Sequence, residues 1–215
     1  VTINCSGSVD AGWMGLFTFA TSDSKITATV KNVKLNLNSN SVSSMCGGII
    51  GDSEINGNDA NYDINIENCH VSNGSLSDSA GGIAGHAFAS IGNCTISNCT
   101  NEATLNGDGC GGIVGSNAAS SGGELQIEYC INLGSISGSN CGGIIGKISG
   151  SENDSFHIFI FNSYNKSDLS NVNSGGIIGP TITKAGESTM ILNCYFYGNI
   201  PVTSVNESNE EGDSV

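Results

Sequence analysis

Nine cysteines are the residues of this 215-residue chain best suited to chemistry, and most of them recur at regular intervals. One series follows Asn or Tyr, and a second precedes a glycine pair. The first series is Cys69, Cys99, Cys130 and Cys194, and the second is Cys46, Cys110 and Cys141. The chain has no Cys-x-x-Cys pair, so neither a zinc ribbon nor a dithiol redox motif is supported. In a stack of repeats each series becomes a column, and we predict buried thiols there, with disulfides or metal binding as alternatives.

Carboxylates are the second reactive group, because a pair of them on one face can cleave glycans. Glu67 and Glu128 hold equivalent positions two repeats apart, which corresponds to roughly 9–10 Å in a stack of strands. The three histidines, His70, His86 and His157, share no position in the repeat, and Gly-x-Ser-x-Gly is absent. We therefore predict no catalytic residue, no metal and no cofactor, and we keep a polysaccharide lyase or glycoside hydrolase as an alternative.

A repeated glycine block sets the framework that must position these residues. Gly-Gly-Ile-x-Gly occurs at Gly47–Gly51, Gly81–Gly85, Gly111–Gly115, Gly142–Gly146 and Gly175–Gly179. The first glycines of successive blocks are 34, 30, 31 and 33 residues apart. A period near 30 residues is typical of a solenoid, in which each repeat packs only on its neighbours.

The residues around each block favour short strands over helices, because Ile and Val runs alternate with Gly, Asn and Ser. We predict an all-β protein, a right-handed parallel β-helix (β-solenoid) of roughly six coils of about 30 residues each. The solenoid is expected over residues 1–202, followed by an acidic, disordered tail or linker over 203–215. An internal isoleucine column is expected from Ile49, Ile83, Ile113, Ile144 and Ile177, and an asparagine ladder from Asn68, Asn98, Asn162 and Asn193.

The Gly-Gly-Ile-x-Gly block, with an upstream Asn-Cys and with Gly15-Leu16-Phe17 in the first unit, resembles the GLUG repeat. This resemblance implies a bacterial surface protein, an adhesin-like protein or an accessory region of an immunoglobulin A peptidase. The family has no shared catalytic motif, so the resemblance assigns no functional residue.

Charge narrows the range of partners. Twenty acidic residues against six lysines give a net charge of −14, which disfavours nucleic acid and anionic lipid surfaces. No apolar stretch is long enough to span a membrane, so we expect no membrane insertion. The hydroxyl- and amide-rich composition favours an extracellular or cell-surface location.

We therefore predict a non-enzymatic structural or adhesion module that presents a polar loop face to a carbohydrate or protein. A subunit of a fibre that assembles through the solenoid ends is an alternative. The loops after the glycine blocks carry the candidate partner-facing residues Asp52, Glu54, Asp59, Asp63, Glu124, Glu152, Asp154 and Glu187.

Overall fold

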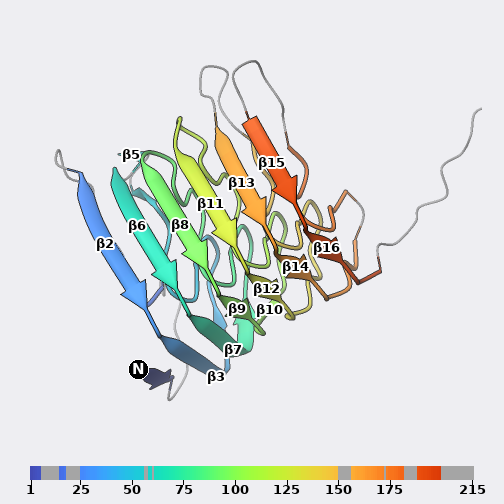
Figure 1. The fold of residues 1–215 in the computed structure, drawn as a ribbon. Coiled ribbons are helices and arrows are strands. Elements are labelled where there is room, and N and C mark those ends of the chain that lie inside the picture. Colours follow the sequence, from blue (N-terminus) through green and yellow to red (C-terminus); the bar gives the residue numbers. More distant parts are fainter. Residues whose placement is uncertain are drawn as a thin grey trace, which may run out of the picture.

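The computed structural model describes residues 1–5, 15–17, 25–55, 58–59, 61–149, 156–171, 173–181 and 188–199, with residues 54–55 and 58–59 described by their backbone alone. Two parallel sheets dominate this part of the chain (Figure 1). The first, here called the long sheet, has the strand order β15-β13-β11-β8-β6-β2. Its strands are β2 (Ile26–Lys31), β6 (Tyr62–Glu67), β8 (Asn93–Ser97), β11 (Glu124–Glu128), β13 (His157–Phe161) and β15 (Ser188–Leu192).

The second sheet, here called the short sheet, has the order β1-β3-β7-β9-β12-β14-β16, with β10 paired to β7. Its strands are β1 (Thr2–Asn4), β3 (Lys34–Val42), β7 (His70–Leu76), β9 (Thr100–Asn101), β10 (Thr104–Leu105), β12 (Ile131–Asn132), β14 (Tyr164–Asn165) and β16 (Tyr195–Phe196). A small antiparallel pair, β4 (Glu54–Ile55) and β5 (Asn58–Asp59), lies in the loop before β6. The described residues contain no helix, and the parallel β-solenoid predicted from the repeats is confirmed.

The glycine blocks form the third side of each coil through single parallel bridges between successive coils. These bridges link Gly47, Gly81, Gly111, Gly142 and Gly175 in one column, and Ile50, Ala84, Val114, Ile145 and Ile178 in the next. Each coil therefore runs through a long strand, a short strand and a glycine corner before it returns to the long sheet.

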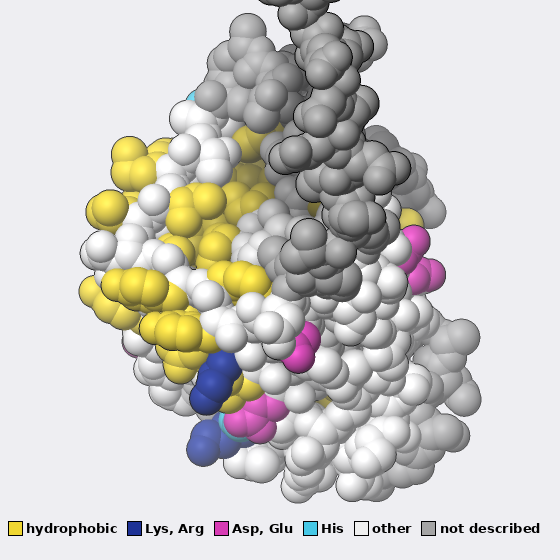
Figure 2. All heavy atoms as spheres, turned by 90° about the vertical axis from the view of Figure 1, so that its right-hand side faces the viewer, with side chains coloured by type: hydrophobic (Ala, Val, Ile, Leu, Met, Phe, Trp, Pro, Cys, Tyr) yellow, Lys and Arg dark blue, Asp and Glu magenta, His cyan; other side chains and the backbone are white. Residues whose placement is uncertain are grey.

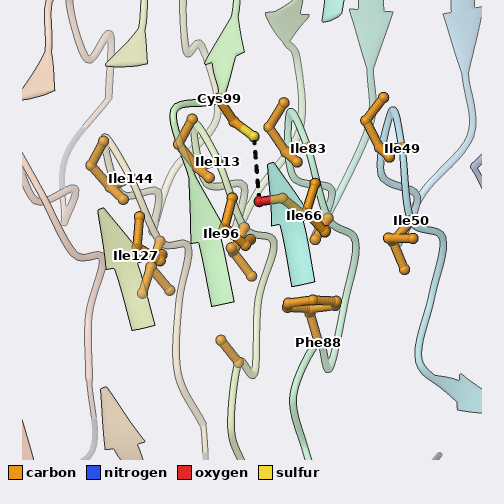
Figure 3. Packing of buried hydrophobic residues seen from close by; sticks show 14 of the residues in the cluster. Ile49, Ile50, Ile66, Ile83, Phe88, Ile96, Cys99, Ile113, Ile127 and Ile144 are labelled. Carbon is orange, nitrogen blue, oxygen red and sulfur yellow. Dashed lines mark hydrogen bonds between the residues drawn. The ribbon is translucent and has the colours of Figure 1, made fainter. Parts of the chain in front are cut away.

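Aliphatic columns fill the interior. Ile49, Ile83, Ile113 and Ile144 are fully buried, and Ile177 in the last coil is half-buried. They face the isoleucines of the long strands, including Ile66, Ile96 and Ile127 (Figure 3). The predicted isoleucine column is thus confirmed, and dry packing of these side chains supplies most of the driving force for stacking.

Close approach of the backbone, both within one glycine block and between successive coils, explains the glycine pair. A Cβ on Gly111 would lie 1.9 Å from the carbonyl oxygen of Val114, and a Cβ on Gly112 would lie 2.0 Å from that of Gly143. Both distances are far inside van der Waals contact. Neither glycine is among the residues with positive φ, so a left-handed backbone is not the reason for these two glycines. The pair is required because neighbouring backbone and side chains occupy the space of a Cβ.

The predicted asparagine column is present and carries a side-chain hydrogen bond, but its members are exposed and not buried as a ladder in the core would be. Asn68, Asn98, Asn162 and Asn193 are exposed and have φ between 49° and 53°. They occupy the turn between the long and short strands, where asparagine tolerates a left-handed backbone better than most residues do. Side-chain bonds along this column do occur at places, as from Asn193 Nδ2 to Asn162 Oδ1 at 3.3 Å.

The buried ladder lies three residues further along each coil. Asn101, Asn132 and Asn165 are fully buried on the inner face of the short sheet. Asn101 Nδ2 donates to Asn132 Oδ1 at 2.9 Å, and Asn132 Nδ2 donates to Asn165 Oδ1 at 2.9 Å. Because each amide also bonds to backbone two residues ahead, these buried polar groups are paired within the protein.

Candidate functional site

The predicted loop carboxylates do not form one continuous described surface. Asp52 is buried, whereas Asp63 and Glu124 lie at the starts of β6 and β11, in one outward column of the long sheet. Lys25 forms an ion pair with Asp63 at 2.8 Å, and this contact lowers the pKa of the Asp63 carboxyl. Glu54 and Asp59 are described by backbone alone, and Glu152, Asp154 and Glu187 lie outside the described residues. Their role as partner-facing residues therefore remains a prediction.

Asp52 instead belongs to a buried polar chain with His86 and Asn117. His86 Nδ1 lies 3.1 Å from Asp52 Oδ1, and His86 Nε2 lies 3.1 Å from Asn117 Nδ2. Asn117 Oδ1 accepts the backbone N–H of Ser149, so its amide nitrogen must face the imidazole and donate to Nε2. The histidine hydrogen then resides on Nδ1 and points to Asp52. Both ring nitrogens are engaged, which favours a structural histidine over a catalytic base.

A polar groove runs beside this chain, with a volume of about 410 Å³. Its lining includes Ser79, His86, Asp108, Asn117, Asn140 and Lys147. The walls are held together by backbone bonds between coils, such as Ser116 N–H to the Ser79 carbonyl. Met45 is the one large apolar side chain in this lining, and the groove contains no Phe, Tyr or Trp, so hydrogen bonds and charge would dominate the binding of a ligand there.

The carboxylate pair considered for glycan cleavage is not poised for it. Register places Glu67, Ser97 and Glu128 in one column, with Ser97 between the two acids. Glu67 forms an ion pair with Lys31 at 2.7 Å, and Glu128 accepts a hydrogen bond from Gln126. Each of the two carboxylates therefore already has a side-chain partner, and the charge of Glu67 is compensated by Lys31.

The cysteine columns are packing elements in the structure. None of the nine cysteines is in a disulfide in the structure, and seven of them are buried. Cys99 Sγ accepts the backbone N–H of Cys69 at 3.4 Å, and Ser163 Oγ replaces it in the equivalent contact with Cys130. Burial raises the pKa of the Cys94 thiol to about 12, so this sulfur is protonated and unreactive near neutral pH. The described residues include no group of three or more His, Cys, Asp or Glu side chains that could hold a metal ion.

The outward face of the solenoid changes from polar to apolar along its axis. Two outward columns of the long sheet begin with polar residues and end in apolar ones. The first column ends in Phe159 and Met190, and the second ends in Phe161 and Leu192. The polar members of the first column are Thr29, Asn65, Thr95 and Gln126, and those of the second are Lys31, Glu67, Ser97 and Glu128. Figure 2, which faces the last coils, shows hydrophobic side chains gathered over this end. Exposed apolar groups that cluster at one place usually mark an interaction surface.

The short sheet shows the same change and ends in a group of tyrosines. Its outward column runs through His70, Thr100, Ile131, Tyr164 and Tyr195. Tyr197 follows two residues after Tyr195 on the same face. Tyr195 and Tyr197 are stacked with ring centroids 6.0 Å apart, and Tyr164 meets Tyr197 edge-on at 6.1 Å.

Tyr164, Lys166, Tyr195 and Tyr197 together line an open hollow of about 800 Å³, here called the tyrosine concavity. Tyr195 and Tyr197 are 55% and 67% exposed. Phe196 between them points inward and packs against the core. The tyrosines project from the side of the sheet, so a further coil at the end of the stack would extend their column and leave it exposed.

Comparison with known proteins gives information about the fold of this chain but not about its chemistry. Neither protein-family models nor curated proteins gave a match to the chain. A solved structure is similar: the 1.30 Å crystal structure of a candidate immunoglobulin A1 protease from Bacteroides ovatus, with a TM-score of 0.53 and 24% sequence identity. The alignment covers 92% of this chain and 62% of that one, so the chain spans less than two thirds of the other protein. The similarity concerns the fold.

Sequence reasoning missed the tyrosine concavity as a site, although a signal for it was present. Tyr164 and Lys166 flank the buried Asn165, and Tyr195 and Tyr197 flank the inward, half-buried Phe196. Alternation around a known inward position predicts outward side chains on both sides.

No helix in the described ranges is long and apolar enough to cross a membrane.

Proposed function

We propose that this chain is a non-enzymatic binding module of an extracellular or cell-surface protein, and that it binds carbohydrate on the tyrosine concavity. The observation that supports carbohydrate binding is the set of three tyrosines around one open hollow of about 800 Å³. Sugar rings present C–H groups on their faces and hydroxyl groups on their edges. Tyrosine matches both, because its ring packs on the C–H face and its phenol exchanges hydrogen bonds.

The remaining surface supports a module without catalysis. The buried His86 uses both ring nitrogens, and Glu67 is paired with Lys31. A stiff parallel stack with one aromatic end is suited to holding a ligand at a fixed distance from its attachment. An extracellular location is supported by the composition, with 12% charged residues, and by the fold shared with a candidate immunoglobulin A1 protease.

A glycan array followed by calorimetry tests the proposal. Replacing Tyr195 or Tyr197 by Ala should weaken glycan binding about tenfold each, because an exposed aromatic contact contributes on the order of 1–1.5 kcal/mol. Tyr129→Asn is the matched control: Tyr129 is 54% exposed but lies in the turn column that asparagine occupies in the other coils. Absence of glycan binding, or equal binding by the tyrosine variants, would refute carbohydrate recognition at this place.

End-to-end self-association is a second candidate, supported by the last coil. Ile191 belongs to the interior column of the long sheet, yet it is 46% exposed. Its strand β15 pairs with β13 on one side, and no described strand lies on the other. An unpaired edge beside apolar side chains favours addition of another strand. Sedimentation at rising protein concentration tests this, and a strict monomer would argue against it.

A further inference from the structure

We infer that the tyrosine concavity selects glycans that carry an anionic group, a carboxylate or a sulfate, and that Lys166 binds this group. The inference rests on the proposed function, since it names the class of carbohydrate for the same site. It depends on where Lys166 lies, on what surrounds it and on which other charges are near.

Lys166 lies on the outward face of the short sheet, in the column that carries Leu133 and Tyr197. Its backbone N–H donates to the Asn132 carbonyl at 2.9 Å, and Tyr197 N–H donates to the Asn165 carbonyl at 2.9 Å. These bonds continue the registers of β12 with β14 and of β14 with β16. Lys166 is therefore fixed between an exposed leucine and an exposed tyrosine.

No carboxylate neutralises this lysine within the described part of the chain. Lys25 and Lys31, by contrast, are ion-paired with Asp63 and Glu67 at 2.8 Å and 2.7 Å. Asp168, the acidic residue nearest to Lys166 along the chain, is exposed, and its Oδ1 accepts hydrogen bonds from Asn199 N and Nδ2 at 2.7 Å and 2.9 Å. The acidic member of the Lys166 column is Glu102, two coils away beyond Leu133, and its Oε2 lies 3.3 Å from His70 Nε2. The exposed ammonium of Lys166 therefore lies beside three tyrosine rings and is available to a ligand. It is a local positive charge in a chain whose net charge is −14.

The surroundings determine which ligand suits this ammonium. A ligand that used charge alone would gain little, because exposed ion pairs in water contribute at most about 1 kcal/mol. A sugar that stacks on Tyr195 and Tyr197 is already oriented, so a carboxylate or sulfate on its edge reaches Lys166 with little further loss of freedom. An acidic peptide lacks the C–H face that packs on the rings, and we therefore favour an acidic glycan over an acidic peptide.

The experiment compares two oligosaccharides with the same backbone, one neutral and one carrying carboxylate or sulfate groups, by calorimetry at low and high salt. We expect the acidic form to bind about fivefold more tightly to the wild-type protein at low salt. The difference should shrink at high salt, because the Debye length falls to about 3 Å at 1 M. Lys166→Met should make the two affinities equal while neutral binding persists, and Lys147→Met in the polar groove should change neither.

The outcomes separate the two proposals. If neither oligosaccharide binds, the proposed function fails and the anionic preference fails with it. If both bind equally to the wild-type protein, the anionic preference alone is overturned. Tighter binding of a glutamate peptide of the same charge, with no binding of the neutral sugar, would overturn both in favour of a peptide site. Circular dichroism of each variant verifies that it is folded.

Discussion

Replacement of Asn132 by Ala tests whether the buried asparagine ladder holds neighbouring coils together. Asn132 Oδ1 accepts from Asn101 Nδ2 at 2.9 Å, and its own Nδ2 lies within 3.0 Å of Asn165 Oδ1, the Gly134 carbonyl and Ser167 Oγ. An amide carries two hydrogens, so three of these bonds form at once. With a net contribution of about 1 kcal/mol for each bond, we expect the variant to lose about 3 kcal/mol of unfolding free energy.

Urea denaturation followed by far-ultraviolet circular dichroism measures this loss. For a slope of 2–3 kcal/mol per molar urea, roughly the upper range for small proteins, the midpoint should fall by about 1 M. Asn93→Ala is the control, because Asn93 is an exposed asparagine of the long sheet, and its replacement should change stability by less than about 0.5 kcal/mol. If Asn132→Ala is no more destabilising than this control, the ladder does not contribute as argued.

Three further predictions follow from packing, burial and charge. Gly112→Ala should prevent folding or cost about 3 kcal/mol in a thermal melt, because its Cβ would lie 2.0 Å from backbone oxygen and 2.5 Å from Asn132 Cγ. Iodoacetamide at pH 8 should leave the seven buried thiols, Cys94 among them, unmodified in the folded protein, and label all nine after denaturation without reductant; fewer than nine would indicate disulfides. The ion pair with Lys25 lowers the pKa of Asp63, so its stabilisation is complete above the unfolded value of about 4 and is lost as pH falls through the folded value. Asp63→Asn should therefore reduce the loss of stability between pH 5 and pH 2, and an unchanged pH profile would contradict this.

The architecture was predictable because a single constraint recurs in every coil. Gly-Gly-Ile-x-Gly encodes a place where backbones touch and an isoleucine turns inward, and five copies set the register of the whole stack. An apolar residue stands five or six positions before each block, and all of these residues are buried: Val42, Leu76, Leu105, Ile136 and Leu169. Because the equivalent residues of successive coils lie in one column, several repeats support the prediction for each position, and one irregular repeat does not change it.

Whether a polar side chain faces the interior or the solvent was harder to predict. Asn98 and Asn101 are three residues apart, yet one occupies an exposed left-handed turn and the other is fully buried. Residue type does not distinguish them, because asparagine suits both a positive φ and an internal hydrogen-bond ladder. Val71 and Phe196 flank the three asparagines in the same column, and their apolar character is the signal that would have identified the inward position.

The site was less predictable than the fold, because recognition depends on features that do not repeat. Tyr164, Tyr195 and Tyr197 lie in the last two described coils, whereas the equivalent positions of Tyr164 and Tyr195 in the three coils before them are His70, Thr100 and Ile131. His86 directly follows a glycine block, but the equivalent positions hold Asp52, Ser116 and Lys147, so the histidine itself does not recur. Its contacts are with Asp52 and Asn117 in the coils on either side. Such contacts become visible only when the coils are placed in three dimensions.

The direction of the hydrogen bonds between coils has a mechanical consequence. These bonds run along the stacking axis, because every strand pairs with its counterpart in the next coil. Tension on the last coil therefore loads one row of bonds at a time and peels that coil away before the next one is strained. Each released coil frees about 30 residues, or roughly 100 Å of slack, so a module anchored at one end and gripped at the other would lengthen in steps under shear flow instead of failing at once.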